Sequence, residues 1–298
     1  MNYNKLISFV FAFAIAATVA AQTLTVGSYN IRYENKEDAQ KGNGWERRCK
    51  SICQQIRWEQ PDIFGAQEVL HGQLQDLVAD LQDYKWIGEG RDDGKTKGEY
   101  APIFYNPKRI KLVETGHFWL NETPDRPALG WDAACIRICT WGHFEDLTTG
   151  KDFYYLNLHM DHVGVKARSE SAKLVMKRIT EMTDGGKKQA VLTGDFNVSQ
   201  ADELYSLFTQ SGVLKDCYEC AKERWAENGT FNGFHTNRFT GDRIDHIFVT
   251  PATVVEAYAV RTDSYWLTEK DGKITRRNLS DHYPIFARIR LNQLTVGN

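Results

Sequence analysis

Strand-like and helix-like segments alternate along this chain without an internal linker, and this alternation most constrains its fold. From residue 22 onward, no low-complexity tract, charge block or Pro/Gly/Ser-rich stretch divides the sequence. Ile52, Cys53 and Ile56 have helical spacing, and Pro61 is expected to end that helix. Alternation of this kind in one undivided chain is typical of an α/β or α+β sandwich.

Other segments extend the same pattern. Apolar residues at helical spacing predict helices over 70–81, 172–182 and 204–208. Runs rich in β-branched and aromatic residues predict strands over 24–30, 62–66, 101–105, 110–118, 135–144, 153–158, 190–193, 244–249 and 285–291. We expect residues 22–298 to form one domain, because nothing in this region marks a boundary.

The first 21 residues have the pattern of a secretory signal peptide. Lys5 precedes an apolar run over 6–17, and the small residues at 19–21 fit a signal-peptidase site. A transmembrane anchor is the alternative, but the apolar run is shorter than the roughly 20 residues that a span needs. We therefore expect export to the periplasm or the extracellular space, without a stable membrane span.

The charge of the chain argues against a general nucleic-acid-binding protein. Lys and Arg number 37 and Asp and Glu 39, which gives a formal net charge of −2. No surplus of cationic side chains is present to bind phosphate backbones unaided. A nuclease is still compatible with this charge, because a bound metal ion can supply the missing positive charge.

Six cysteines are present, and their spacing favours structural roles. They are Cys49, Cys53, Cys135, Cys139, Cys217 and Cys220. An exported chain permits disulfides, but Cys135 and Cys139 lie in a predicted strand, where four residues span about 13 Å, too far for a bridge between them. Only Cys217 and Cys220 have the CxxC spacing of a metal or redox site, and no matching second pair follows.

Polar side chains recur where the predicted strands end. The six segments are GSYNIR (27–32), GAQE (65–68), NLHMDH (157–162), TGDFN (193–197), DRIDHI (242–247) and LSDHYP (279–284). Any one of them has an ordinary structural explanation, such as a turn, a helix cap or a buried histidine. Strand ends and the loops after them are where layered folds usually place their sites. The argument for a site therefore depends on all six occurring together.

In this order the six segments resemble the endonuclease/exonuclease/phosphatase superfamily, and the Gly-Asp-Phe-Asn and Ser-Asp-His-Tyr-Pro elements are the most specific part of the likeness. The resemblance runs from Asn30 to His282, nearly the whole chain after the signal peptide. It implies a four-layer sandwich of two mixed β-sheets packed face to face, with helices on both outer faces. It also implies a metal-dependent hydrolase acting on phosphoric ester bonds.

The resemblance implies a metal site at Asn30, Glu68 and Asp281. Glu68 matches the principal metal carboxylate of the family, Asp281 a second acid near the metal, and Asn30 an amide oxygen that helps to hold metal or phosphate. Phosphoric esters are anionic and repel an attacking water, so a hard cation that neutralises this charge assists hydrolysis. Oxygen ligands favour Mg²⁺, with Mn²⁺ as the alternative.

Five further residues match catalytic positions of the family. Asp195 is expected to orient or deprotonate the attacking water, and the amide of Asn197 to donate to a phosphoryl oxygen. His159 and His282 match two histidines that flank the scissile phosphate, and Asp245 matches the carboxylate partner of His282. Either histidine could be the acid, and Asp195 competes for the role of base. Our hypothesis is that His282 with Asp245 stabilises the pentacovalent phosphorane or assists the nucleophile, while His159 assists the leaving group.

Four further residues lie close to these positions in the sequence or match the family more loosely. Glu99 is expected to support His159 as a carboxylate partner, and Arg137 to contact the substrate phosphate, both by looser resemblance. His162 and His246 lie beside the motifs and are not expected to enter the chemistry.

The resemblance leaves the substrate open, because specificity depends on the loops of a fold. The segment over 157–162 is most similar to the deadenylase-like members, which favours a nuclease-like phosphodiesterase. We expect a monomer that acts on a phosphodiester such as nucleic acid. The alternative is a phosphatase or phosphodiesterase for small sugar, inositol or lipid-headgroup phosphates. A non-catalytic binding module is disfavoured because the metal and acid–base residues are all present.

Overall fold

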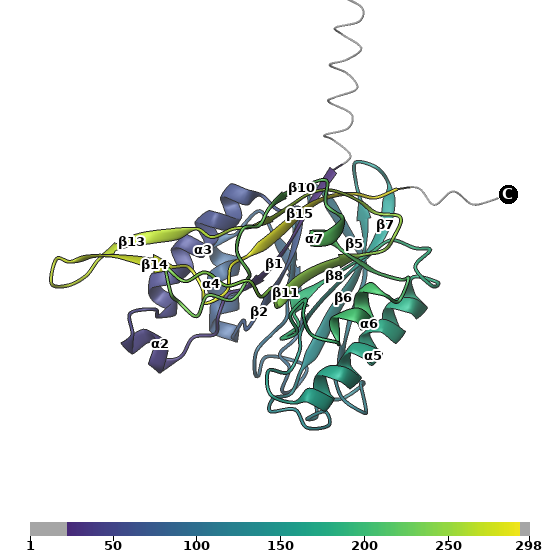
Figure 1. Cartoon of the computed structure of the whole chain (residues 1–298), viewed down its shortest axis with the longest axis horizontal. Helices are drawn as coiled ribbons and strands as arrows, with labels where there is room; N and C mark the ends of the chain where they lie inside the picture. Colours follow the sequence, from purple (N-terminus) through teal and green to yellow (C-terminus); the bar gives the residue numbers. More distant parts are fainter. Residues whose placement is uncertain (1–22, 293–298) are drawn as a thin grey trace, which may run out of the picture.

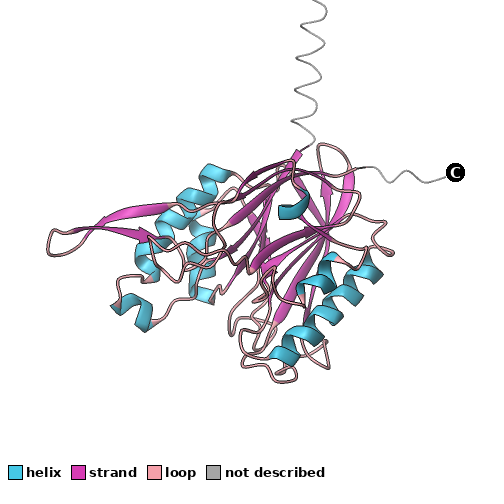
Figure 2. Cartoon of the chain, in the orientation of Figure 1, coloured by secondary structure: helices cyan, strands magenta, loops and turns pink. Residues whose placement is uncertain are grey.

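The computed structural model describes residues 23–292 (Figure 1). The predicted signal peptide over 1–21 lies outside the described residues. Two large β-sheets and their helices make up the described part of the chain, and strands and helices are distinguished by colour in Figure 2. Within residues 23–292, no helix has the length and apolarity required to cross a bilayer.

The first sheet has seven strands and is mixed. In spatial order they are β10 (Glu223–Trp225), β12 (Val254–Val260), β15 (Ile285–Arg290), β1 (Thr23–Asn30), β2 (Ile63–Gln67), β4 (Ile103–Tyr105) and β3 (Lys85–Ile87). At its centre, β1 is parallel to β2 and antiparallel to β15. The second strand of the central pair therefore ends at the same edge of the sheet as the first.

The second sheet has six strands and is also mixed. Their order is β5 (Ile110–Trp119), β6 (Ile138–Asp146), β7 (Lys151–His159), β8 (Ala190–Asp195), β11 (Asp245–Val249) and β9 (Lys215–Asp216). The central pair, β7 and β8, is parallel, and β11 runs antiparallel to β8. This order brings the ends of β7 and β8 beside the beginning of β11.

Helices cover the outer faces of both sheets, which confirms the predicted four-layer sandwich (Figure 1). On the first sheet they are α3 (Trp45–Glu59) and α4 (His71–Asp80), and on the second α5 (Val165–Met182) and α6 (Tyr205–Thr209). The short helices are α2 (Lys36–Gln40) and α7 (Cys217–Cys220). A two-stranded hairpin of β13 (Ser264–Thr268) and β14 (Ile274–Asn278) projects from the side of the sandwich that carries α3 (Figure 1).

Apolar burial explains why these segments form these elements. Ile52, Cys53 and Ile56 are all buried on the inner face of α3, as their spacing predicts. The helix ends at Glu59, and Gln60 takes a left-handed conformation before the proline. Each fully buried aliphatic side chain of this kind stabilises the fold by about 1.5–3 kcal/mol.

A buried polar layer joins the two sheets below their strand ends. The Asn157 side chain on β7 donates to the carbonyl oxygen of Ala66 at 2.7 Å, and the Gln67 amide donates to Asn157 Oδ1 at 2.7 Å and to Ser28 Oγ at 3.0 Å. Gly65 leaves the space for this contact, because a Cβ atom there would lie 2.3 Å from the Asn157 side chain. Hydrogen bonds of fixed geometry therefore set how the sheets sit on each other.

The structure places the cysteines differently from the sequence prediction at one position. The strand predicted to begin at Cys135 begins at Ile138, so Cys135 lies in the preceding loop and Cys139 alone lies in the strand. The bend at 134–135 is stabilised by backbone N–H groups that donate to Asp161, and these bonds replace strand pairing. All six cysteines are free thiols in the structure.

Candidate active site

Five of the predicted residues meet because of strand register. Asn30 is the last residue of β1, Glu68 follows β2, and His159 and Asp195 end the parallel pair β7 and β8. His159 lies opposite Asp195, and Asp195 lies opposite Asp245 at the start of β11. The polar layer described above lies directly below these positions, so it sets the distance between the ends of the two sheets.

A cavity of about 560 Å³ opens at this edge of the sandwich. Eight of the ten predicted site residues line it, namely Glu68, Glu99, Arg137, His159, Asp195, Asn197, Asp281 and His282. The other two, Asn30 and Asp245, hydrogen-bond to lining residues. The structure thus brings all ten together, and their individual roles stay predictions.

Asn30 joins two carboxylates at the floor of the site. Its Nδ2 donates to Glu68 Oε1 and to Asp195 Oδ2, both at 3.0 Å. Its Oδ1 accepts the backbone N–H of Arg32 at 3.0 Å, which fixes the orientation of the amide. In this structure Asn30 therefore presents its N–H groups to the carboxylates. Its predicted contact to a metal would use Oδ1, which here accepts the Arg32 backbone N–H.

Asp281 shares the Arg32 guanidinium with Glu68. The Arg32 Nε atom is 3.6 Å from Asp281 Oδ2 and 2.8 Å from Asp38 Oδ2, and its Nη1 is 3.8 Å from Glu68 Oε2. Burial raises the pKa of Asp281, although the charge of His282 opposes this shift. One guanidinium thus lies within 4 Å of three carboxylates, so the net charge of this group is negative when all three are ionised.

His282 is held as a charged donor by two acids. Its Nδ1 is 2.8 Å from Asp245 Oδ2, and its Nε2 is 3.6 Å from Asp195 Oδ2. Burial alone would lower the pKa of His282, but the charges of Asp245 and Asp195 outweigh burial and hold that pKa well above its ordinary value. The predicted pairing of Asp245 with His282 is present in the geometry.

His159 has the opposite electrostatic environment. Burial lowers its pKa well below the ordinary value, and the guanidinium groups of Arg137 and Arg91 lower it further. Its Nε2 is 3.2 Å from Asn197 Nδ2 and 3.5 Å from Asp195 Oδ2. The two histidines therefore differ in charge although both lie within 4 Å of the same carboxylate oxygen.

Asp195 lies between the two histidines. Its Oδ1 accepts the backbone N–H of Asn197 at 2.9 Å, which leaves Oδ2 facing Asn30 and the imidazoles. Burial, reinforced by the charge of Asp245, raises the pKa of Asp195 to about 7. A carboxylate with this pKa is suited to accept a proton near neutral pH.

The two supporting predictions have different outcomes. Glu99 Oε2 is 3.9 Å from His159 Nδ1, beyond hydrogen-bond distance, and accepts instead from Arg91 Nη1 at 2.6 Å. Arg137 lines the cavity, as expected of a phosphate contact, and is bound to Asp161 and His162. Glu99 therefore supports His159 at most from a distance.

Sequence reasoning missed other lining residues. Arg32, Arg91, Phe231 and Phe234 all line the cavity from loops. The Phe231 ring packs edge-on against His282 with ring centroids 5.1 Å apart. Arg32 belongs to the segment over 27–32, but the other three residues have no periodicity or motif spacing that could have singled them out.

Comparison with known proteins agrees with this geometry. The sequence model of the Endonuclease/Exonuclease/phosphatase family matches residues 27–282. The chain belongs to this family. Its members hydrolyse phosphoric esters, so this chain is a phosphoester hydrolase of the endonuclease/exonuclease/phosphatase family.

Three relatives illustrate how similar members of this family are. A structure of a family protein from Bacteroides thetaiotaomicron is 48% identical, with a TM-score of 0.88, over 91% of this chain and 98% of that one. The mannosyl-6-phosphatase of Bacteroides thetaiotaomicron VPI-5482 is also 48% identical, with a TM-score of 0.86, over 89% and 99%. An uncharacterized protein of Acanthamoeba polyphaga mimivirus is 30% identical over 264 residues, covering 81% of this chain and 90% of the viral protein.

The donors at the floor of the cavity fit a divalent metal ion. Ligand atoms of Glu68, Asp195 and His282 lie within 4.8 Å of one another. His282, however, is held charged by its neighbouring acids, with both ring nitrogens protonated and directed at Asp245 and Asp195, so it is a poor ligand. The buried carboxylates of Glu68 and Asp281 are the better donors, and family members of this kind typically depend on a metal.

Proposed function

We propose that this chain is an exported, Mg²⁺-dependent phosphatase that releases phosphate from a small sugar phosphate. The distribution of charge in the cavity supports this proposal most directly. Each cationic side chain that lines the cavity has an acidic partner within 4.0 Å; the pairs are Arg32 with Asp38, Lys41 with Glu37, Arg91 with Glu99, and Arg137 with Asp161.

A cavity without surplus cations suits one phosphate group. A polynucleotide presents a phosphate at every nucleotide, and proteins bind it with several unpaired lysines and arginines. Here a bound metal ion would concentrate positive charge at the floor, near Glu68 and Asp281, where a single phosphate would be attracted. The 48% identity to a mannosyl-6-phosphatase supports a sugar phosphate as the ester.

Mg²⁺ is the cation that this donor set favours. Glu68 and Asp281 offer carboxylate oxygens, and Mg²⁺ prefers oxygen ligands and keeps several waters. When bound, the cation would polarise a phosphoryl oxygen and neutralise its charge. Manganese has the same ligand preference, so Mn²⁺ is expected to support the reaction as well.

Asp195 and His282 would have different roles in proton transfer. Asp195 would accept the proton of the attacking water, since its pKa of about 7 matches that task. His282, kept charged by Asp245, would donate to the phosphate oxygens or the departing sugar oxygen. This assignment revises the expectation that His159 assists the leaving group, because the lowered pKa of His159 makes it a neutral side chain with no proton to give up easily.

Phosphate release from hexose 6-phosphates, measured with Mg²⁺ and with EDTA, tests the proposal. The second substrate is supercoiled plasmid, which tests the nuclease-like alternative under identical conditions. We expect metal-dependent phosphate release and no nicking. Nicking that depends on Mg²⁺, without phosphate release from any sugar phosphate, would instead establish the phosphodiesterase that the sequence alone favoured.

The metal site has a test independent of turnover. Mg²⁺ should raise the melting temperature of the wild-type chain, because a ligand that binds only the folded state stabilises it. We expect this shift to disappear in Glu68→Gln, which keeps the shape of the side chain and removes its charge. Glu114→Gln on β5, outside the cavity, is the matched control and should keep the shift.

A further inference from the structure

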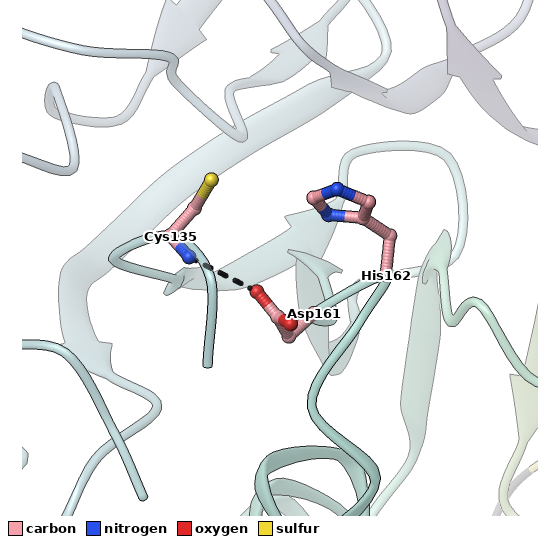
Figure 3. Close-up of side chains that lie close together, drawn as sticks. All are labelled: Cys135, Asp161 and His162. Carbon is pink, nitrogen blue, oxygen red and sulfur yellow. Dashed lines mark hydrogen bonds between the residues drawn. The ribbon is translucent and has the colours of Figure 1, made fainter. Parts of the chain in front are cut away.

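One wall of the active-site cavity contains His162 and Cys135, which the chemistry described above does not use, beside Arg137. Cys135, Arg137 and His162 all line the cavity, and Asp161 lies buried beside them (Figure 3). The sequence motif around His162 drew attention to this region, but neither His162 nor Cys135 has a part in the proposed reaction.

Asp161 anchors this wall through the backbone. Its Oδ1 accepts the N–H groups of Val163 and Gly164 at 3.0 and 2.7 Å, and its Oδ2 accepts those of Ala134 and Cys135 at 3.1 and 3.2 Å. Burial opposes the charged form, yet the backbone donors of Gly164 and Val163 outweigh it and lower the pKa of Asp161 to about 2. Both oxygens are therefore committed to the protein itself.

The same group has the spacing of a metal site, but its Asp161 and His162 atoms already contact Arg137. Ligand atoms of Cys135, Asp161 and His162 lie within 4.8 Å of one another. Arg137, however, places Nε 3.4 Å from Asp161 Oδ2 and donates from Nη2 to His162 Nδ1 at 2.9 Å. The guanidinium is thus the cation of this cluster, and a metal ion would have to displace it.

The Arg137 contact fixes which nitrogen of His162 bears the proton. An arginine nitrogen can only donate, so His162 Nδ1 must accept and the ring proton lies on Nε2. Figure 3 shows the imidazole and the Cys135 thiol extending to the same side, away from the Asp161 carboxylate. His162 therefore offers an N–H donor beside a thiol at the cavity surface.

Arg137 itself has a donor to spare. Its side chain is only 4% exposed, and within residues 23–292 its Nη1 is buried without a hydrogen-bond partner. A buried donor left unsatisfied costs free energy, and a ligand oxygen could relieve that cost only if the guanidinium moved to expose Nη1 to the cavity. The charge of Arg137 is balanced by Asp161, so the wall is rich in N–H donors and has no net charge.

We propose that His162, Arg137 and Cys135 form a hydroxyl-binding wall that recognises the sugar part of the substrate. This inference rests on the proposed function, because it assumes that the ester is a sugar phosphate. An uncharged surface of donors matches the oxygens of a neutral polyol, whereas a second phosphate would require an unbalanced cation. Asp161 is the positioning residue of the wall, and Arg137 transmits its orientation to His162.

The experiment compares two substrates with the same primary phosphate ester. Mannose 6-phosphate has ring hydroxyls, and ethyl phosphate has none. We expect His162→Leu to lower kcat/KM for mannose 6-phosphate about three- to tenfold, mainly through KM, and to leave ethyl phosphate unchanged. His162→Gln, whose amide can donate again, should restore most of the loss.

A control variant and a metal measurement complete the design. His143→Leu, on β6 and outside the active-site cavity, should behave as wild type with both substrates. Equal losses on both substrates, or no loss in His162→Leu, would overturn the hydroxyl-binding wall while the phosphatase assignment stands. Stoichiometric zinc in the purified chain that is lost in Cys135→Ser would also overturn it, in favour of a metal site.

The proposed function fails on a different result. Wild-type protein that hydrolyses no sugar phosphate, although it nicks plasmid with Mg²⁺, would remove the basis of both proposals. Wild-type protein that hydrolyses mannose 6-phosphate and ethyl phosphate with equal kcat/KM would contradict the wall alone, because hydroxyl recognition would then contribute nothing.

Discussion

Asp245 contacts His282 on the side of the imidazole that faces away from the cavity. The carboxylate does not line the cavity, but its Oδ2 is 2.8 Å from Nδ1. It therefore fixes the ring and keeps it charged without touching the substrate. Its partner oxygen Oδ1 is buried without a hydrogen bond among the described residues, which leaves the negative charge directed at the histidine.

Removing this charge should weaken catalysis more than binding. We expect Asp245→Asn to lower kcat by about 100-fold or more, since a general acid contributes on the order of 10²–10⁴ to the rate, with little change in KM. The pKa of His282, followed by NMR, should fall because the raising charge is gone. Asp152→Asn, next to the surface histidine His143 at 3.9 Å, is the control and should leave both quantities as in wild type.

Sequence predicts those site residues that lie at the ends of regular strands, because strand register alone determines their position. Asn30, His159 and Asp195 each end an apolar run, and strand register then brings them together. Arg91 and Phe231 could not be predicted in this way, because their loops take their course from tertiary contacts. Arg91 reaches the cavity through its bond to Glu99, and Phe231 through the bridge that its backbone forms with His282.

At the level of single elements, the contact of β2 with β7 depends on a missing side chain. A Cβ atom on Gly65 would lie 2.3 Å from the Asn157 side chain, which cannot move aside because it is bonded to Gln67 and to the backbone of Ala66. This single position therefore limits how closely the two sheets approach.

Gly65→Ala should push the sheets apart below the active site. We expect it to lower the free energy of unfolding by about 1–3 kcal/mol, the usual cost of overpacking, and to lower kcat through the displaced strand ends. Gly72→Ala in α4 is the matched control, because no atom lies within 4 Å of its new Cβ. There alanine should stabilise the helix by about 0.5–1 kcal/mol. Urea unfolding of both variants measures these changes, and equal stability of the two would contradict the argument.

A second element contact joins β9 to the loop before β11. Asp216 accepts from Arg243 Nη1 at 2.8 Å and from the Tyr205 hydroxyl at 2.5 Å, and it also caps α7. Burial opposes the charged form, but the contacts with His246 and Arg243 outweigh it and hold the pKa of Asp216 well below its ordinary value. Arg243, in the segment over 242–247, thus has a structural role.

The pH dependence of Asp216→Asn follows from that lowered pKa. Because the folded pKa is depressed, the ionised carboxylate stabilises the fold fully above the ordinary aspartate pKa of about 3.9 and loses this effect as the pH falls further. At pH 7 we expect the variant to unfold more easily by about 3–5 kcal/mol. Thermal unfolding from pH 7 to 3 should show the difference shrinking below pH 4. Asp184→Asn, at an exposed carboxylate, should show no such trend.

For the whole molecule, sequence patterns predicted many of the elements, but the order of the layers came from the family resemblance and not from periodicity. Helical spacing predicted α3, α4, α5 and α6, and strand-like runs predicted nine of the thirteen strands of the two sheets, whereas β3, β9, β10 and β12 were not predicted. The family resemblance supplied the packing of these elements. The hairpin of β13 and β14 was missed, because it projects from the body and half-exposed strands such as 264–268 lack a buried face. Short edge strands such as β9 were missed because two residues leave no periodicity.

The whole fold does not depend on disulfides. All six thiols are free, and Cys53, Cys139 and Cys217 are buried. We therefore expect a reducing agent to leave the melting temperature unchanged. A thiol reagent should label the native chain at no more than the three half-buried cysteines and at all six after unfolding. Fewer than six reactive thiols in the unfolded, unreduced chain would reveal a disulfide and contradict this expectation.

The polar layer of Ser28, Gln67 and Asn157 has a consequence for protein engineering. These side chains belong to strands, whereas the residues that face the proposed sugar belong to loops. The frame that aligns the reacting groups is thus built separately from the surface that selects the ester. Loops grafted from another family member onto these strands should change substrate preference and leave the catalytic alignment intact.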